Sequence, residues 1–300
     1  MFNNKSLSIF LLLISSIGIS FGGLIMRNIE VADAWQIIFY RSFFFTVSIL
    51  TIICFQNRNS VVFVKTIKNV GYPGIIGAVF YTFANIAFVH AFANTTVANS
   101  LFTLSAIPFI TAILAFYFLD ENISKRTISI MIVALLGIII MISEGLALGQ
   151  IYGNLMALVT AVSFSCFTIV LRKYRAVDML PTILIGGIII LSVTFFISLG
   201  NLSIPLNEIF LCFLWGGVLS GCVNYIFIYA TRHLYASSVT FFMLFEFALG
   251  PFWVWIFLNE TITRNTFYGG ILVMVSVFIY SVIEVDIARK KIQKGRINLH

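Results

Sequence analysis

The chain consists mainly of long apolar runs separated by short polar connections. Ten runs approach the roughly 20 residues that a helix needs to cross the hydrocarbon core of a bilayer. No stretch shows the short alternating segments of a membrane β-barrel, and in lipid a helix satisfies its own backbone hydrogen bonds. The pattern predicts an all-α polytopic membrane protein with ten transmembrane helices, near 7–26, 34–55, 71–92, 95–118, 127–143, 152–171, 181–199, 209–230, 236–258 and 266–285.

The composition agrees with lipid surroundings. Of the 300 residues, 60% are hydrophobic and 10% are charged, against about 25% charged in an ordinary soluble domain. The connections are too short to hold a soluble domain. The four cysteines form no C-x-x-C pair and have no histidine at metal-binding spacing. We therefore expect neither a metal site nor another cofactor.

The basic residues predict the orientation in the membrane. With the N-terminus inside, 15 of the 18 Lys and Arg residues fall on the cytoplasmic side, while Arg27 and Arg264 fall outside and Arg41 lies within the second span. Positive charge accumulates on the inner side of membrane proteins, so both termini should be cytoplasmic. The basic residues form no stripe or recognition helix of the nucleic-acid-binding kind. We expect the lipid bilayer as a partner, and no nucleic acid.

The chain also matches itself. The stretch NIAFVHAFA (85–93) aligns with NYIFIYATR (224–232) at an offset of 139 residues. The same offset aligns FYFLDENIS (116–124) with WIFLNETIT (255–263), and an offset of 145 aligns SFGGLIMR with SCFTIVLR. These alignments place Asn85 on Asn224, Glu121 on Glu260 and Arg27 on Arg172.

Two copies of one five-helix unit follow from this repeat. Five is an odd number, so the second copy enters the membrane with the opposite polarity. We predict inverted repeats at 1–146 and 147–288, followed by a basic cytoplasmic tail at 289–300. Inverted repeats are typical of secondary transporters, which bind substrate near the middle of the membrane between the repeats.

The motifs FLDENIS and FLNETIT, with LSAIPFITAILAFYFL before the first, resemble the EamA family of the drug/metabolite transporter superfamily. The resemblance covers nearly the whole chain. It implies a secondary transporter of small metabolites, often amino acids and related compounds, that works commonly outward and without ATP hydrolysis. It also implies a central cavity lined by spans 1, 3 and 4 of one copy and 6, 8 and 9 of the other. The second copy departs from the pattern, because Phe247 occupies the position equivalent to Pro108 and a proline follows at Pro251.

Glu246 is the leading candidate for a binding residue. It lies near the middle of the ninth predicted span, in FFMLFEFALGPFWVW, where a charge costs about 2.5–3.5 kcal/mol on insertion scales. Helical spacing places Phe242 and Trp253 on its face, and aromatic rings attract ammonium groups. We expect Glu246 to hold a substrate amine or to exchange a proton. The alternative is a structural hydrogen bond to a neighbouring helix.

Four further residues with polar side chains accompany it. Asn85 and Asn224 occupy equivalent positions in the third and eighth spans, where an amide can orient a polar substrate or join two helices. Tyr81 precedes Asn85 by four residues on the same face, and is expected to supply an aromatic wall with Trp253 and Phe242. Arg41 is interpreted as a structural residue that snorkels or pairs.

Three functions compete on this evidence. The first is export of a small zwitterionic or cationic metabolite, such as an amino acid, across the inner membrane by alternating access. The second is uptake of an organic cation or nucleoside-like metabolite. The third, a lipid-modifying enzyme, is disfavoured because only Glu246 lies deep and no nucleotide loop, H-E-x-x-H or G-x-S-x-G motif occurs. We expect no catalytic residues; the substrate, the direction, the coupling ion and the oligomeric state stay open.

Overall fold

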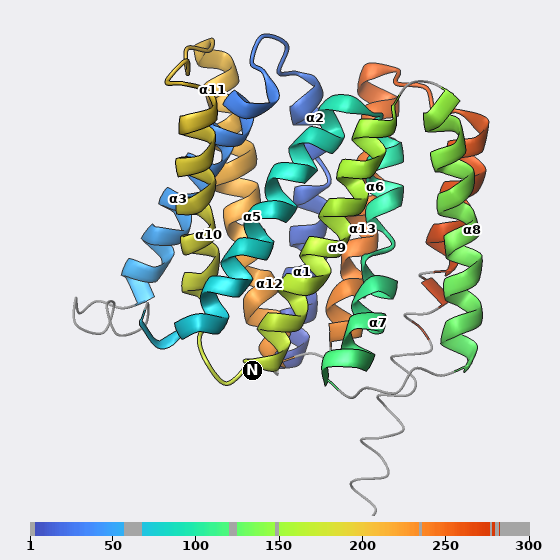
Figure 1. The fold of residues 1–300 in the computed structure, drawn as a ribbon, viewed down its shortest axis with the longest axis horizontal. Helices are drawn as coiled ribbons and strands as arrows, with labels where there is room; N and C mark the ends of the chain where they lie inside the picture. The colour runs from blue at the N-terminus through green and yellow to red at the C-terminus, as the bar shows by residue number, and fades with distance from the viewer. Residues whose placement is uncertain are drawn as a thin grey trace, which may run out of the picture.

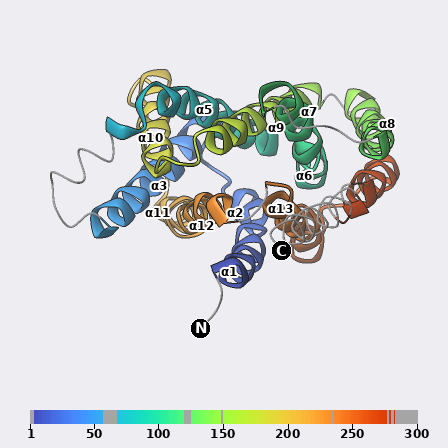
Figure 2. The ribbon, with the colours of Figure 1, turned by 90° about the horizontal axis from the view of Figure 1, so that it is seen from below.

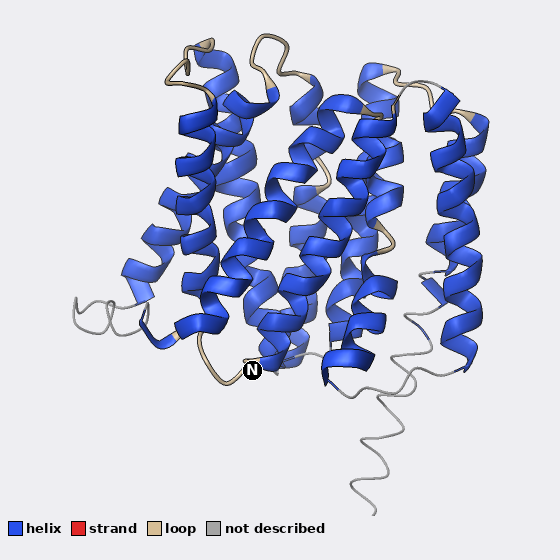
Figure 3. Cartoon of the chain, viewed as in Figure 1, coloured by secondary structure: helices blue, strands red, loops and turns tan. Residues whose placement is uncertain are grey.

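The computed structural model describes residues 4–56, 68–119, 125–147, 150–233, 236–276, 278–279 and 282. Within these residues the chain forms helices and loops and no strand (Figure 3). The helices are α1 (Asn4–Ile19), α2 (Gly22–Arg27), α3 (Ala34–Gln56), α5 (Gly71–Asn94), α6 (Val97–Leu104), α7 (Ile107–Leu119), α8 (Lys125–Ala147), α9 (Ile151–Lys173), α10 (Leu180–Ile197), α11 (Leu206–Cys212), the π-helix η1 (Phe213–Ser220), α12 (Gly221–His233), α13 (Ala236–Leu258) and a further helix at 264–276.

The helices run side by side as an elongated bundle (Figure 1), which looks like two layers when seen from below (Figure 2). In one layer α5 packs along α9, and in the other α1 packs between α12 and α13. At one end of the bundle α3 contacts both α10 and η1. At the other end α8 stands beside helix 264–276, so close that a Cβ on Gly137 would meet the carbonyl oxygen of Gly269.

Seven segments of the described chain are long and apolar enough to cross a membrane, and they coincide with seven of the ten predicted spans. The other three predictions, at 127–143, 236–258 and 266–285, overlap residues outside the described backbone or side chains. The outer surface is itself apolar, with side chains such as Phe55, Phe116 and Phe196 exposed. A large exposed apolar surface is what a lipid-facing exterior requires. The protein is therefore an all-helical polytopic membrane protein.

The start of α3 follows from its sequence. Asp33 and Gln36 exchange hydrogen bonds, since the backbone N–H of Gln36 donates to Oδ1 of Asp33 and the backbone N–H of Asp33 donates to Oε1 of Gln36. This reciprocal capping satisfies donors that the first helical turn leaves free. The carboxylate of Asp33 thus caps the start of α3.

The fourth predicted span is broken into two helices. α6 ends at Leu104 and α7 begins at Ile107. Pro108 lacks an N–H group and its ring would clash with the carbonyl of Leu104, so the helix ends before the proline. In the second copy α13 continues across Pro251 without a break. The two matching halves of the sequence therefore differ at this point.

The eighth predicted span contains the π-helix η1. Gly216 lies in it against α3, and a Cβ at this position would overlap the carbonyl oxygen of Arg41. Only glycine permits so close an approach of two helices. Single stretches of π-helix recur at functional sites, and this one brings Trp215 and Ser220 toward the side chain of Arg41.

A buried carboxylate fixes the loop between α2 and α3. Glu208 of α11 is 2% exposed and accepts backbone hydrogen bonds from Glu30, Val31 and Ala32 at 2.9–3.0 Å. Three such donors compensate the carboxylate for its lost hydration. The loop at 28–33 is thereby attached to the start of α11.

Candidate functional site

A cavity of about 120 Å³ lies between the two layers of helices. Its lining comes from α1, α3, α5, α9, η1, α12, α13 and the junction of α6 with α7. All six spans that the family resemblance implies contribute, and Arg41 adds the second span. Two lining residues, Leu104 and Ile107, flank the break before Pro108, so the irregular backbone borders the cavity, where such backbone is tolerated inside a membrane.

Glu246 lines this cavity, next to the buried Phe247. Within the described residues no hydrogen bond or ion pair joins its carboxylate to another side chain. The aromatic rings of Phe88, Phe164 and Phe227 line the same space. The arrangement is an acidic group with free acceptors in an aromatic-walled cavity, which suits a cationic ligand.

Asn85 and Asn224 face the same cavity from α5 and α12. Each donates through Nδ2 to the backbone carbonyl four residues earlier, Asn85 to Tyr81 and Asn224 to Ser220, both at 2.9 Å. These bonds orient the two amides alike and commit one donor of each. An amide oxygen can accept a hydrogen bond while the Nδ2 of the same group donates. The structure therefore brings together four of the predicted site residues, Glu246, Asn85, Asn224 and Tyr81.

The predicted aromatic residues divide among different positions. Tyr81 lines the cavity, but its ring is 2% exposed and packs against Phe45 and Phe167, with centroids 5.7 and 5.2 Å away. Trp253 is not among the lining residues described; its Nε1 donates to Oγ of Ser20 at 2.9 Å and its ring stacks on Phe21. In the structure Trp253 thus joins α13 to the connection between α1 and α2. The side chain of Phe242 falls outside the described part of the chain.

Arg41 is the cavity residue that the sequence reasoning did not select. It is 7% exposed, and its guanidinium lies over Trp215, with Cζ 4.5 Å from the ring centroid, and 5.5 Å from that of Phe88. The signal was available in the sequence: an arginine inside a span is expensive in lipid. The sequence reasoning expected a structural residue that snorkels or pairs, and that expectation stays a prediction.

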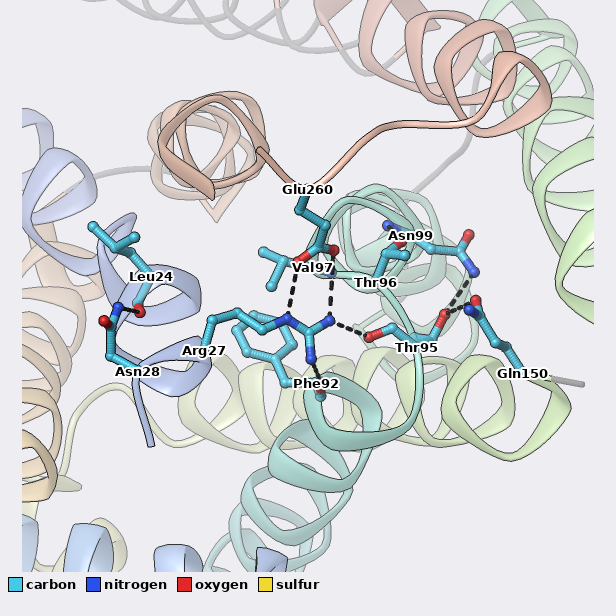
Figure 4. A network of polar contacts seen from close by, with 10 residues as sticks. All are labelled: Leu24, Arg27, Asn28, Phe92, Thr95, Thr96, Val97, Asn99, Gln150 and Glu260. Atoms are coloured by element: carbon cyan, nitrogen blue, oxygen red, sulfur yellow. Dashed lines mark hydrogen bonds and ion pairs between the residues drawn. The ribbon is translucent and has the colours of Figure 1, made fainter. Parts of the chain in front are cut away.

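A second polar cluster forms around Arg27 and Glu260 (Figure 4), and none of its labelled residues lines the cavity. Nε of Arg27 forms an ion pair with Glu260 at 2.9 Å, and its Nη atoms donate to the carbonyls of Phe92 and Thr95. Glu260 also accepts from the backbone N–H of Val97 at 3.0 Å. The cluster joins α2, α5 and α6 to the loop after α13. Glu121, the repeat equivalent of Glu260, lies outside the described residues.

The model of the EamA-like transporter family matches residues 6–143 and, a second time, residues 148–282. The chain belongs to the EamA-like transporter family. The resemblance inferred from the paired motifs is thereby confirmed. The protein is a membrane transporter and not an enzyme, and its partners include a small-molecule substrate and the bilayer.

Two individual proteins are similar to this EamA-like chain. The S-adenosylmethionine uptake transporter of Rickettsia bellii (strain RML369-C) is 21% identical over 246 residues, which cover 80% of this chain and 81% of the relative. A solved protein structure superposes with a TM-score of 0.67 at 10% identity, over 93% of this chain and 98% of the other. At that identity the second similarity supports the fold alone.

Proposed function

We propose that this EamA-like protein carries a small metabolite with a positively charged group through the central cavity. The observation that supports this most directly is Glu246, a carboxylate without a described partner in a cavity walled by aromatic rings. A cation that entered would replace the missing partner. The acceptor oxygens of Asn85 and Asn224 would orient its polar groups.

The leading candidate for the cargo is S-adenosylmethionine, and the proposed direction is uptake. The similar Rickettsia transporter is named for that substrate and that direction. S-adenosylmethionine is an organic cation with a nucleoside part and an amino-acid part, so it belongs to the second function class inferred above. Export of an amino acid is the competing hypothesis, and transport of labelled methionine tests it.

The size of the cavity supports alternating access. A volume of about 120 Å³ is smaller than the roughly 300–1,000 Å³ of pockets that enclose drug-sized ligands. A metabolite with a nucleoside part requires the two layers to separate. We propose that the described structure is a contracted state and that rearrangement of the repeats enlarges the cavity toward one side of the membrane at a time.

Ten spans in two inverted repeats, bounded as predicted at 1–146 and 147–288, form part of the proposal. The packing supports it: α5 with α9 corresponds to α12 with α1 when the copies are exchanged. The loop after α2 lies at the upper end of Figure 1, and the equivalent loop after α9 lies at the lower end. Cavity residues also correspond, since Asn85 and Asn224 are 139 residues apart, as are Ile107 and Glu246. The inner membrane and cytoplasmic termini complete the proposed topology.

Transport by the purified full-length protein in liposomes tests the function. Labelled S-adenosylmethionine, methionine and adenosine are presented outside, with and without an imposed proton gradient. We expect S-adenosylmethionine to accumulate, and Glu246→Gln to reduce its rate at least tenfold. The control is Glu30→Gln, which alters an exposed carboxylate. Wild-type liposomes that take up none of the three compounds would contradict the proposed cargo. A Glu246→Gln variant with wild-type rate and wild-type gradient dependence would exclude both the cation role and the proton role.

A further inference from the structure

Arg41 has far fewer hydrogen-bond partners than a buried structural arginine needs. Within the described residues its fully enclosed Nε has no hydrogen-bond partner, and the hydrogen bond that the guanidinium makes joins Nη2 to Oγ of Ser220 at 3.4 Å. Within the described residues no carboxylate lies in ion-pair distance of the guanidinium. A buried charge without partners is expensive.

Arg27 in the same protein is an arginine whose guanidinium nitrogens all have hydrogen-bond partners. Its Nε, Nη1 and Nη2 all donate, to a carboxylate and to two backbone carbonyls, at 2.8–3.1 Å. The chain therefore provides partners where an arginine serves to join helices. At Arg41 it provides instead a surface beneath the guanidinium, formed by Trp215, and an opening onto the cavity.

Two contacts with η1 hold Arg41 in place, one at its backbone and one at its guanidinium. Its backbone carbonyl packs against Gly216, which leaves no room for a larger residue, and its guanidinium rests on Trp215. Both come from η1, so the π-helix positions the main chain and the side chain of Arg41 together. A guanidinium held in this way presents a planar set of donors, which matches the two oxygens of a carboxylate.

We infer that Arg41 binds the carboxylate of the substrate, and that Arg41 and Glu246 together select metabolites that carry both a carboxylate and a cation. The two residues line the same cavity from α3 and α13. A substrate with an α-amino and an α-carboxyl group supplies each of them with a partner. The inference rests on the proposed function, because it assumes that cargo passes through this cavity.

The test uses two pairs of probes that differ by one carboxylate. The first pair is S-adenosylmethionine and its decarboxylated form; the second is methionine and 3-(methylthio)propylamine. Affinities come from ligand-dependent thermal stabilisation of the purified full-length protein. We expect wild type to bind the carboxylate member of at least one pair about 10- to 100-fold more tightly, the ratio that one charged hydrogen-bonding group provides.

Three variants separate Arg41 from a structural role. Arg41→Gln should bring the two members of a pair to within about threefold of each other by weakening the carboxylate member. Arg41→Lys should retain part of the preference, because the charge remains and the planar set of donors is lost. Glu246→Gln, the matched variant across the cavity, should weaken both members and leave their ratio unchanged.

Two results would overturn the inference. One is a wild-type protein that is stabilised equally by both members of each pair, or by neither. The other is Arg41→Gln weakening both members by the same factor, which would mean that Arg41 only maintains the cavity. If Arg41→Gln does not fold, the ratio of affinities that wild type shows for the two members of each pair still tests the inference. Failure of the proposed function is recognised separately: wild-type liposomes would then take up none of the labelled compounds, whatever the ratio of affinities.

Discussion

The ion pair of Arg27 with Glu260 should make a measurable contribution to stability. It links the end of α2 to the loop that follows α13, segments 233 residues apart in sequence. Arg27→Gln shortens the side chain and removes its charge, so the ion pair and the bonds to the carbonyls of Phe92 and Thr95 are lost (Figure 4). Glu260 keeps only the backbone N–H of Val97 among its described donors.

The expected loss is about 2 kcal/mol in the apparent free energy of unfolding. Fully exposed ion pairs contribute about 0–1 kcal/mol, and removal of one partner of a buried pair costs about 3–5 kcal/mol. The side chains of Arg27 and Glu260 keep 28% and 22% of their exposure, so the pair lies between these limits. The two carbonyl acceptors raise the value within that range.

Denaturant titration in mixed detergent–lipid micelles measures the effect. Arg264→Gln is the matched control, because Arg264 is exposed near the same loop and loses the same charge. The double variant with Glu260→Gln should be less destabilised than the sum of the two single variants, by about 1 kcal/mol, because both singles remove the same pair. An Arg27→Gln variant within about 0.5 kcal/mol of the control, the range of ordinary surface substitutions, would refute this account.

Three further predictions concern backbone packing. Gly216→Ala should destabilise the protein by about 2 kcal/mol or more and reduce binding of the carboxylate probes, because its Cβ would overlap the carbonyl of Arg41; an unchanged melting temperature would count against the close approach of η1 to α3. Glu208→Ala should cost about 3 kcal/mol, since three backbone donors lose their acceptor, and hydrogen exchange at 30–32 should accelerate. Pro108→Ala should leave stability within about 1 kcal/mol of wild type and slow liposome transport severalfold, because a continuous helix would replace the break at the cavity; an unaltered rate would remove that break from the transport cycle.

The internal repeat was the most productive pattern in the sequence. It placed Asn85 on Asn224 from a short alignment, and the structure has both amides in one cavity with the same backbone hydrogen bond. A repeated sequence folds into repeated local geometry, which accounts for the matching hydrogen bonds of the two amides. The prediction that Trp253 lines the site relied on its helical spacing from Glu246. Such spacing gives the side of the helix on which a residue lies, but not which neighbouring segment that residue contacts. Trp253 in fact contacts Ser20 and Phe21 of the chain between α1 and α2.

By itself the sequence determined the solvent, the helical class and the family, because the lengths of the apolar runs and the placement of charge decide how a chain inserts into lipid. Only the tertiary structure decided the surroundings of the two arginines. Arg41 lines the cavity and its Nε has no hydrogen-bond partner among the described residues, whereas all three guanidinium nitrogens of Arg27 donate hydrogen bonds. Both are arginines beside apolar residues, and no local pattern distinguishes them. The difference arises from what distant segments bring to each, a carboxylate and carbonyls in one case and the ring of Trp215 in the other.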